Sequence, residues 1–100
     1  MFAYSPGCEY CASQDPIISE FQKAHPEVGI TRARIATLNS EQKGLIEGTS
    51  GHPVMVFYYG NYKRQVVGLT SHGGLEAALS GLQAQVAQGK KTETGGTYRI

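Results

Sequence analysis

Cys8 and Cys11, the two cysteines of this 100-residue chain, are the residues best suited to carry chemistry. Two residues separate them. If the segment is helical, residues three apart are neighbours with Cβ atoms roughly 5–6 Å apart, and a small adjustment brings such a pair within disulfide reach. A disulfide that closes so short a loop constrains the unfolded chain little, so the spacing favours a reactive pair over a structural staple.

The residues on either side of the pair place it at the start of a helix. The aromatic-rich segment Met1–Ser5 is typical of a strand, and Ser5-Pro6-Gly7 has the composition of a turn. Apolar residues then recur at helical spacing at Ile17, Phe21 and Ala24. Unpaired N–H groups and a partial positive charge mark a helix N-terminus. Thiol pKa values there fall from about 8.5 to roughly 3.5–7.5. We therefore expect Cys8 to be the attacking thiolate and Cys11, deeper in the helix, to resolve the mixed disulfide.

Two other interpretations of the cysteine pair are half a zinc site and a pair of plain core cysteines. Zinc normally takes four ligands, often from two such pairs. The remaining candidates, His25, His52 and His72, are scattered and lack the spacing of a zinc finger.

Composition narrows the class of protein. A net charge of +1 gives no case for nucleic acid or an anionic membrane surface as a partner. The longest uninterrupted apolar run, Val54–Tyr59, is far short of the roughly 18 residues of a membrane span. The sequence shows no basic-then-apolar leader, so the expected location is the cytoplasm, or the periplasm or exterior if a leader was removed.

The rest of the chain predicts one α/β domain over residues 1–88, followed by a polar tail over residues 89–100. A helix from Cys8 to Ala24 contains Pro16, which either kinks it or ends it. Val28–Ile35 alternates like a strand, and Asn39 or Ser40 begins a short helix through Glu47, with Leu45 and Ile46 turned inward.

The second half of the domain contains the buried strand of the sheet. Val54–Tyr59 predicts that strand, and Gly60-Asn61 predicts a turn to its partner, Tyr62–Val67. Ser71 caps the last helix, whose apolar stripe is Leu75, Ala78, Leu79, Leu82 and Val86. The order β-α-β-α-β-β-α predicts a mixed sheet with helices on both faces.

Over residues 2 to 84 the sequence resembles the thioredoxin-fold family. The likeness rests on Cys8-Glu9-Tyr10-Cys11 at a strand-to-helix turn, on Pro16 within the helix, and on Gly51-His52-Pro53 before a hydrophobic strand. It also rests on Val67-Gly68, followed by Ser71 and Leu75 at the start of the last helix. The resemblance implies that Pro53 is a cis-proline facing a redox-active centre, with the backbone of His52 pairing with an extended substrate chain.

The sequence also departs from that family. Gly7 stands in place of a tryptophan, and Phe2 in place of a buried aspartate. Arg34 is either a stand-in for the family's lysine near the site or a solvated strand residue. The usual first strand and helix are missing. We therefore expect Val28–Ile35 to form an exposed sheet edge; either residues 97–100 fold back as a substitute strand, or two copies form a homodimer edge to edge.

Three residues outside the pair are candidates for substrate binding: His52, Pro53 and Tyr10. His52 is either an ordinary loop histidine or an imidazole beside Cys8 that favours the thiolate when protonated, an effect that Glu9 opposes. Tyr10, like Tyr4, either lines the substrate surface or simply packs.

The sequence thus predicts a thiol–disulfide oxidoreductase of the thioredoxin-like kind, without a cofactor and with a role in cell redox homeostasis. Its expected partners are protein or low-molecular-weight disulfides and an upstream reductase or oxidant. The alternatives are a glutaredoxin-like, glutathione-dependent reductase and a redox-inactive interaction domain that keeps the fold.

Overall fold

Strands and helices alternate along the chain in the predicted order, with one short 3-10 helix added. The computed structural model describes residues 1–89 and 98–100. The elements are β1 (Phe2–Tyr4), α1 (Glu9–Ala24), β2 (Arg32–Arg34), the 3-10 helix η1 (Ile35–Thr37), α2 (Ser40–Leu45), β3 (Val54–Tyr59), β4 (Tyr62–Val67) and α3 (His72–Gly89).

The four strands form one mixed sheet in the order β2-β1-β3-β4. β1 runs parallel to β2, with Phe2 opposite Arg32, and antiparallel to β3, with Phe2 opposite Met55. β3 and β4 form an antiparallel hairpin from Val54 opposite Val67 to Tyr59 opposite Tyr62. The α/β class and the mixed sheet are therefore as predicted.

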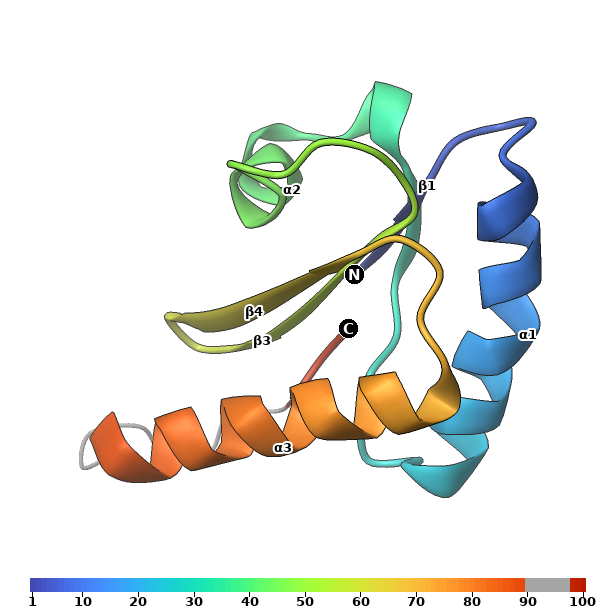
Figure 1. Ribbon diagram of the computed structural model, residues 1–100. Coiled ribbons are helices and arrows are strands. Elements are labelled where there is room, and N and C mark those ends of the chain that lie inside the picture. The colour runs from blue at the N-terminus through green and yellow to red at the C-terminus, as the bar shows by residue number, and fades with distance from the viewer. Residues whose placement is uncertain (90–97) are drawn as a thin grey trace.

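Helices cover both faces of this sheet, as the order of elements predicts. α1 and α3 pack on the face that carries Phe2, Met55 and Phe57. α2 lies against the other face, where Ala3, Val54 and Val56 are buried. Figure 1 shows α2 and α3 on opposite sides of the β3–β4 hairpin. Successive strand residues point to opposite faces, so β3, buried on both, lacks alternation between apolar and polar residues.

The two later helices follow the sequence closely. All five residues of the predicted α3 stripe are buried: Leu75, Ala78, Leu79, Leu82 and Val86. Ser71 caps α3, since its Oγ accepts the N–H of Gly74 at 3.1 Å. Asn39 caps α2 in a capping box with Gln42, and α2 ends at Leu45, two residues before the predicted end.

The predicted helix α1 forms, but of its three predicted apolar residues only Phe21 is fully buried. Pro16 lies inside the helix and does not end it. The buried residues, however, are Cys11, Gln14, Ile18 and Phe21, whereas Ile17 is half-buried and Ala24 exposed. Gln14 lies on the apolar face at helical spacing, and its polar side chain concealed that face in the sequence.

The predicted strand over Val28–Ile35 is also too long, because only Arg32–Arg34 pair with β1 and a 3-10 helix begins at Ile35. The earlier residues bond to the C-terminal segment instead. The Gly29 N–H donates to the Tyr98 carbonyl at 3.1 Å, and the Ile100 N–H donates to the Gly29 carbonyl at 2.8 Å. β1 is only three residues long and provides no backbone hydrogen-bond partners for Gly29. The C-terminal segment provides these partners instead.

Residues 98–100 lie inside the sheet, and not at its outer edge. Arg99 pairs parallel with Gly29 and antiparallel with Tyr58. Thr31 joins the two chain ends: its N–H donates to Ile100 at 2.9 Å, and its carbonyl accepts the Phe2 N–H at 2.8 Å. The segment therefore continues the line of β1, and Figure 1 shows both ends of the chain together at the sheet. Residue 97, the first of the predicted added strand, lies outside the described residues.

The outer edge at β2 is short and charged. Arg32 and Arg34 are both exposed there. Short edge strands that carry charged side chains resist pairing with another sheet, so this edge does not favour the homodimer that we considered. Across residues 1–89 and 98–100, no helix combines the length and apolar character needed to cross a membrane.

Candidate redox site

A disulfide joins Cys8 and Cys11 across the first turn of α1, with Cα atoms 5.2 Å apart. Cys8 is the N-cap of the helix, and its Sγ accepts the backbone N–H of Cys11 at 3.0 Å. Cys8 is half-buried, whereas Cys11 is only 5% exposed. Cys8 is thus the more exposed of the two residues, and a backbone donor stabilises its sulfur as a thiolate.

The turn before Cys8 sets this geometry. Gly7 has a φ of 77°, a left-handed conformation that glycine adopts without steric cost. A Cβ on Gly7 would meet no atom within 4 Å, so the requirement for glycine is conformational and does not come from crowding. The Cys8 N–H closes the turn by donating to the Ser5 carbonyl at 3.3 Å. The chain consequently leaves β1 and enters α1 with Cys8 at the helix tip.

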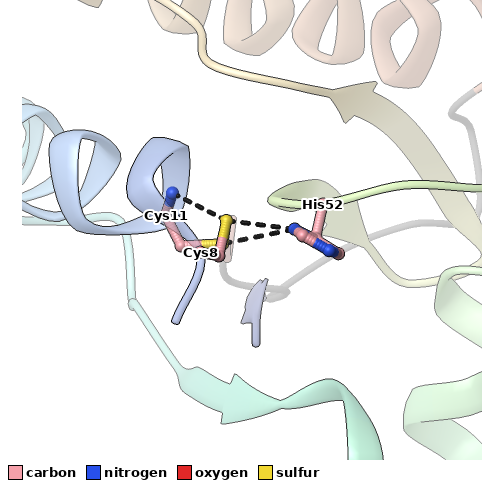
Figure 2. A group of neighbouring side chains, drawn as sticks. All are labelled: Cys8, Cys11 and His52. Carbon is pink, nitrogen blue, oxygen red and sulfur yellow. Dashed lines mark hydrogen bonds between the residues drawn. A yellow bond between two sulfur atoms is a disulfide. The ribbon is translucent and has the colours of Figure 1, made fainter. Parts of the chain in front are cut away.

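The loop before β3 brings His52 to the two sulfurs. The His52–Pro53 peptide is cis, as the family resemblance implies. The imidazole Nδ1 lies 3.0 Å from the Sγ of Cys8 and 3.9 Å from the Sγ of Cys11, and Figure 2 shows this nitrogen directed at both. The imidazole of His52 therefore lies beside Cys8, as the second of our two interpretations of this residue requires.

Exposed apolar side chains lie on the elements that form the site. Tyr10, in the first turn of α1, is 64% exposed; Val67, the last residue of β4, is 46% exposed, and Leu69, in the loop that follows, is 48% exposed. Pro53 is buried, and its carbonyl accepts the Gly68 N–H at 2.8 Å, which fixes the end of β4 beside the cis peptide. Of the predicted substrate-binding residues, Tyr10 and His52 are therefore accessible, while Pro53 shapes the loop.

A hollow of about 360 Å³ adjoins the disulfide. Both cysteines line it, together with Phe2, Tyr4, Asp15 and Arg32. The Tyr4 ring is half-buried and packs 5.9 Å from that of Phe2. The Arg32 Nε donates to Asp15 at 3.1 Å, so the hollow carries an ion pair at its polar end.

Arg32, and not Arg34, is the cation of this hollow. The sequence places both arginines two apart on one strand, hence on the same face, and cannot choose between them. Contacts with α1 decide: Arg32 donates to Asp15 and Ser19 of α1 and lines the hollow, whereas Arg34, opposite Tyr4, is not among the described residues that line it. The stand-in role that we considered for Arg34 therefore has no support in its position.

Gln14 is a second residue that sequence reasoning missed. Its side chain is fully buried, with 0% exposure. It donates to the Thr70 carbonyl at 3.0 Å and accepts the Thr70 N–H at 2.7 Å. This pair of bonds ties α1 to the loop that follows β4, and so holds the cysteine helix against the segment beside the cis peptide. A glutamine within a helix carries no sequence signal for such a role.

The remaining histidines form a separate cluster. Both imidazoles bond to Glu76, His25 at 2.7 Å and His72 at 3.0 Å. The hydrogen bond to Glu76 raises the pKa of His25, and the same bond lowers the pKa of Glu76. His25 and His72 therefore join the end of α1 to the start of α3 and take no part in the cysteine site.

Comparisons of the chain with protein-family models, with curated proteins and with solved structures find no match. The chemistry of the site accordingly rests on its own geometry. A dithiol at this position has one sulfur, that of Cys8, with a backbone donor and an imidazole beside it, and a second, on the more deeply buried Cys11, one helical turn further in. That arrangement suits stepwise exchange between thiols and a disulfide.

Proposed function

We propose that the protein is a thioredoxin-like thiol–disulfide oxidoreductase in which Cys8 attacks and Cys11 resolves. The observation that carries the proposal is the environment of the Cys8 Sγ, which lies 3.0 Å from the Cys11 N–H and 3.0 Å from the His52 Nδ1. A hydrogen-bond donor and a protonated imidazole both favour the thiolate, which is the nucleophilic form.

The reaction proceeds in two exchanges. The Cys8 thiolate attacks one sulfur of a substrate disulfide; a mixed disulfide forms, and the other substrate sulfur leaves as a thiolate. The Cys11 thiolate then attacks the Cys8 Sγ, which closes the Cys8–Cys11 disulfide and releases the second substrate thiolate. The substrate gains two electrons and two protons, and the protein dithiol is oxidised. An upstream reductase returns the dithiol, or an oxidant runs the cycle in reverse.

The difference in exposure supports this division of roles. Cys8, at the helix tip, is the more exposed residue of the pair, whereas Cys11 is 5% exposed and belongs to the buried face of α1. An external disulfide in line with the Cys8 sulfur therefore meets less obstruction than one approaching Cys11. Cys11 in turn is close enough to attack the sulfur of Cys8 once the mixed disulfide has formed, because the Cα atoms are 5.2 Å apart.

The surroundings of the site favour polypeptide substrates. Tyr10, Val67 and Leu69 are exposed large apolar side chains, and they suit apolar side chains on either side of a substrate cysteine. A glutathione-dependent enzyme needs cations free to hold the carboxylates of the tripeptide. Arg32, the cation in the hollow, already bonds to Asp15 and Ser19, so the glutathione alternative is less well supported.

Reduction of insulin disulfides with dithiothreitol as the source of electrons tests the proposal. We expect turnover by the native chain, its loss in Cys8→Ser, and accumulation of a stable mixed disulfide in Cys11→Ser. A parallel assay coupled to glutathione reductase measures the alternative activity. Full turnover in Cys8→Ser would sink the assignment of the nucleophile, and a native chain inactive in both assays would indicate a redox-inactive domain.

A further inference from the structure

We infer that the reduced protein binds one Zn²⁺ through the sulfurs of Cys8 and Cys11 and the Nδ1 of His52. These three ligand atoms, from the tip of α1 and the loop before β3, all lie within 4.8 Å of one another. Figure 2 shows the imidazole nitrogen and both sulfurs facing the same point. The inference rests on this convergence and does not depend on the proposed exchange activity.

The separations match those of a zinc site. Zn–S bonds of about 2.3 Å and Zn–N bonds of about 2.0–2.1 Å at tetrahedral angles place sulfur and nitrogen about 3.6 Å apart. The distances from Nδ1 to the two sulfurs are 3.0 and 3.9 Å, on either side of that value. Reduction removes the covalent bond between the sulfurs, which then separate to the roughly 3.8 Å that two thiolates on one zinc require.

The chemical types of the ligands also suit zinc. Two thiolates and one neutral imidazole neutralise the charge of the divalent ion, and soft thiolate ligands select zinc over magnesium or calcium. Binding displaces two protons, one from the Cys11 thiol and one held between Cys8 and His52, and leaves the oxidation state of every atom unchanged. Three protein ligands leave the fourth position to water, and the exposure of His52 gives solvent access to it.

Zinc and the disulfide therefore exclude each other. The oxidised pair has no thiolate to donate, so only the dithiol binds the metal. The bound metal in turn occupies the Cys8 thiolate that exchange requires. The same three atoms thus form a metal site whose occupancy depends on the redox state of the cysteines.

Competition between the reduced protein and a chromophoric chelator, with Zn²⁺ alone as the probe and oxygen excluded, tests the inference. We expect one zinc per reduced chain and none for the oxidised chain. Removing a zinc ligand should cost at least as much affinity as removing an outer-shell partner, which typically costs roughly 10–100-fold. His52→Ala should therefore weaken binding by more than about tenfold, while the matched control His72→Ala binds like the native chain. Equal affinity in His52→Ala, or no binding by the reduced native chain, would overturn the inference.

A second measurement uses only the native chain, so it does not depend on a variant folding. Stoichiometric Zn²⁺ should slow alkylation of both thiols of the reduced protein at least about tenfold, and a chelator should restore the rate. Unchanged alkylation rates would contradict zinc binding by the pair. Insulin reduction in the presence of chelator measures exchange separately, so loss of one activity is distinguished from loss of the other.

Discussion

Replacing His52 with valine should raise the pKa of the Cys8 thiol by about one unit. The imidazole Nδ1 lies 3.0 Å from the Cys8 Sγ in an exposed setting. The dielectric constant of water therefore gives a lower bound on the electrostatic attraction between the two groups. At that distance the attraction between an imidazolium and a thiolate is about 1.4 kcal/mol. This energy corresponds to about one pKa unit and, for a two-electron couple, to about 30 mV of reduction potential.

Both quantities are measurable on the reduced chain. The pH dependence of the alkylation rate gives the pKa of the Cys8 thiol, and equilibrium with a redox buffer gives the potential of the pair. Since the thiolate belongs to the reduced state, losing its stabilisation should make the potential more negative. His72→Val is the matched control, because His72 bonds to Glu76 and not to a cysteine. An unchanged pKa in His52→Val would refute the electrostatic role of His52.

Three further predictions concern stability, each measured by urea denaturation. Gln14→Leu leaves the partly buried N–H and carbonyl of Thr70 without their side-chain partner and should lower the unfolding free energy by about 1–3 kcal/mol. A loss below about 0.5 kcal/mol would contradict a stabilising role for these two bonds. Burial lowers the pKa of the Met1 ammonium to about 4, so the unfolded chain binds its proton more readily and stability should rise from pH 4 to pH 8, by at most about 1.4 kcal/mol per unit. The raised pKa of His25 has the opposite effect on stability. The stability that His25 contributes is fully present below the pKa it has in the unfolded chain, and it is lost as the pH rises through its pKa in the folded protein. His25→Gln should therefore make stability rise more steeply with pH. Deleting Tyr98–Ile100 removes a fully buried isoleucine and should cost at least about 3 kcal/mol; an unchanged midpoint would show that the segment is dispensable.

The sequence by itself determined the local elements and the place of the cysteines among them. The β-branched and aromatic run of β3, the Gly60-Asn61 turn and the apolar stripe of α3 act over a few residues, so their bounds follow from spacing and turn chemistry. The same holds for Cys8 at a helix tip, because Ser5-Pro6-Gly7 fixes the turn before it.

Only the tertiary structure decided which distant groups meet. Gln14 is buried and bonded because Thr70 presents both of its backbone groups to it, and Arg32 lines the hollow because Asp15 and Ser19 of α1 lie within hydrogen-bond reach of it. Residues 98–100 entered the sheet because the short β1 leaves the backbone around Gly29 and Tyr58 without other partners. Contacts between residues far apart in the sequence depend on backbone hydrogen bonding and burial across the whole fold. They produce no periodic pattern of residues from which the sequence could predict them.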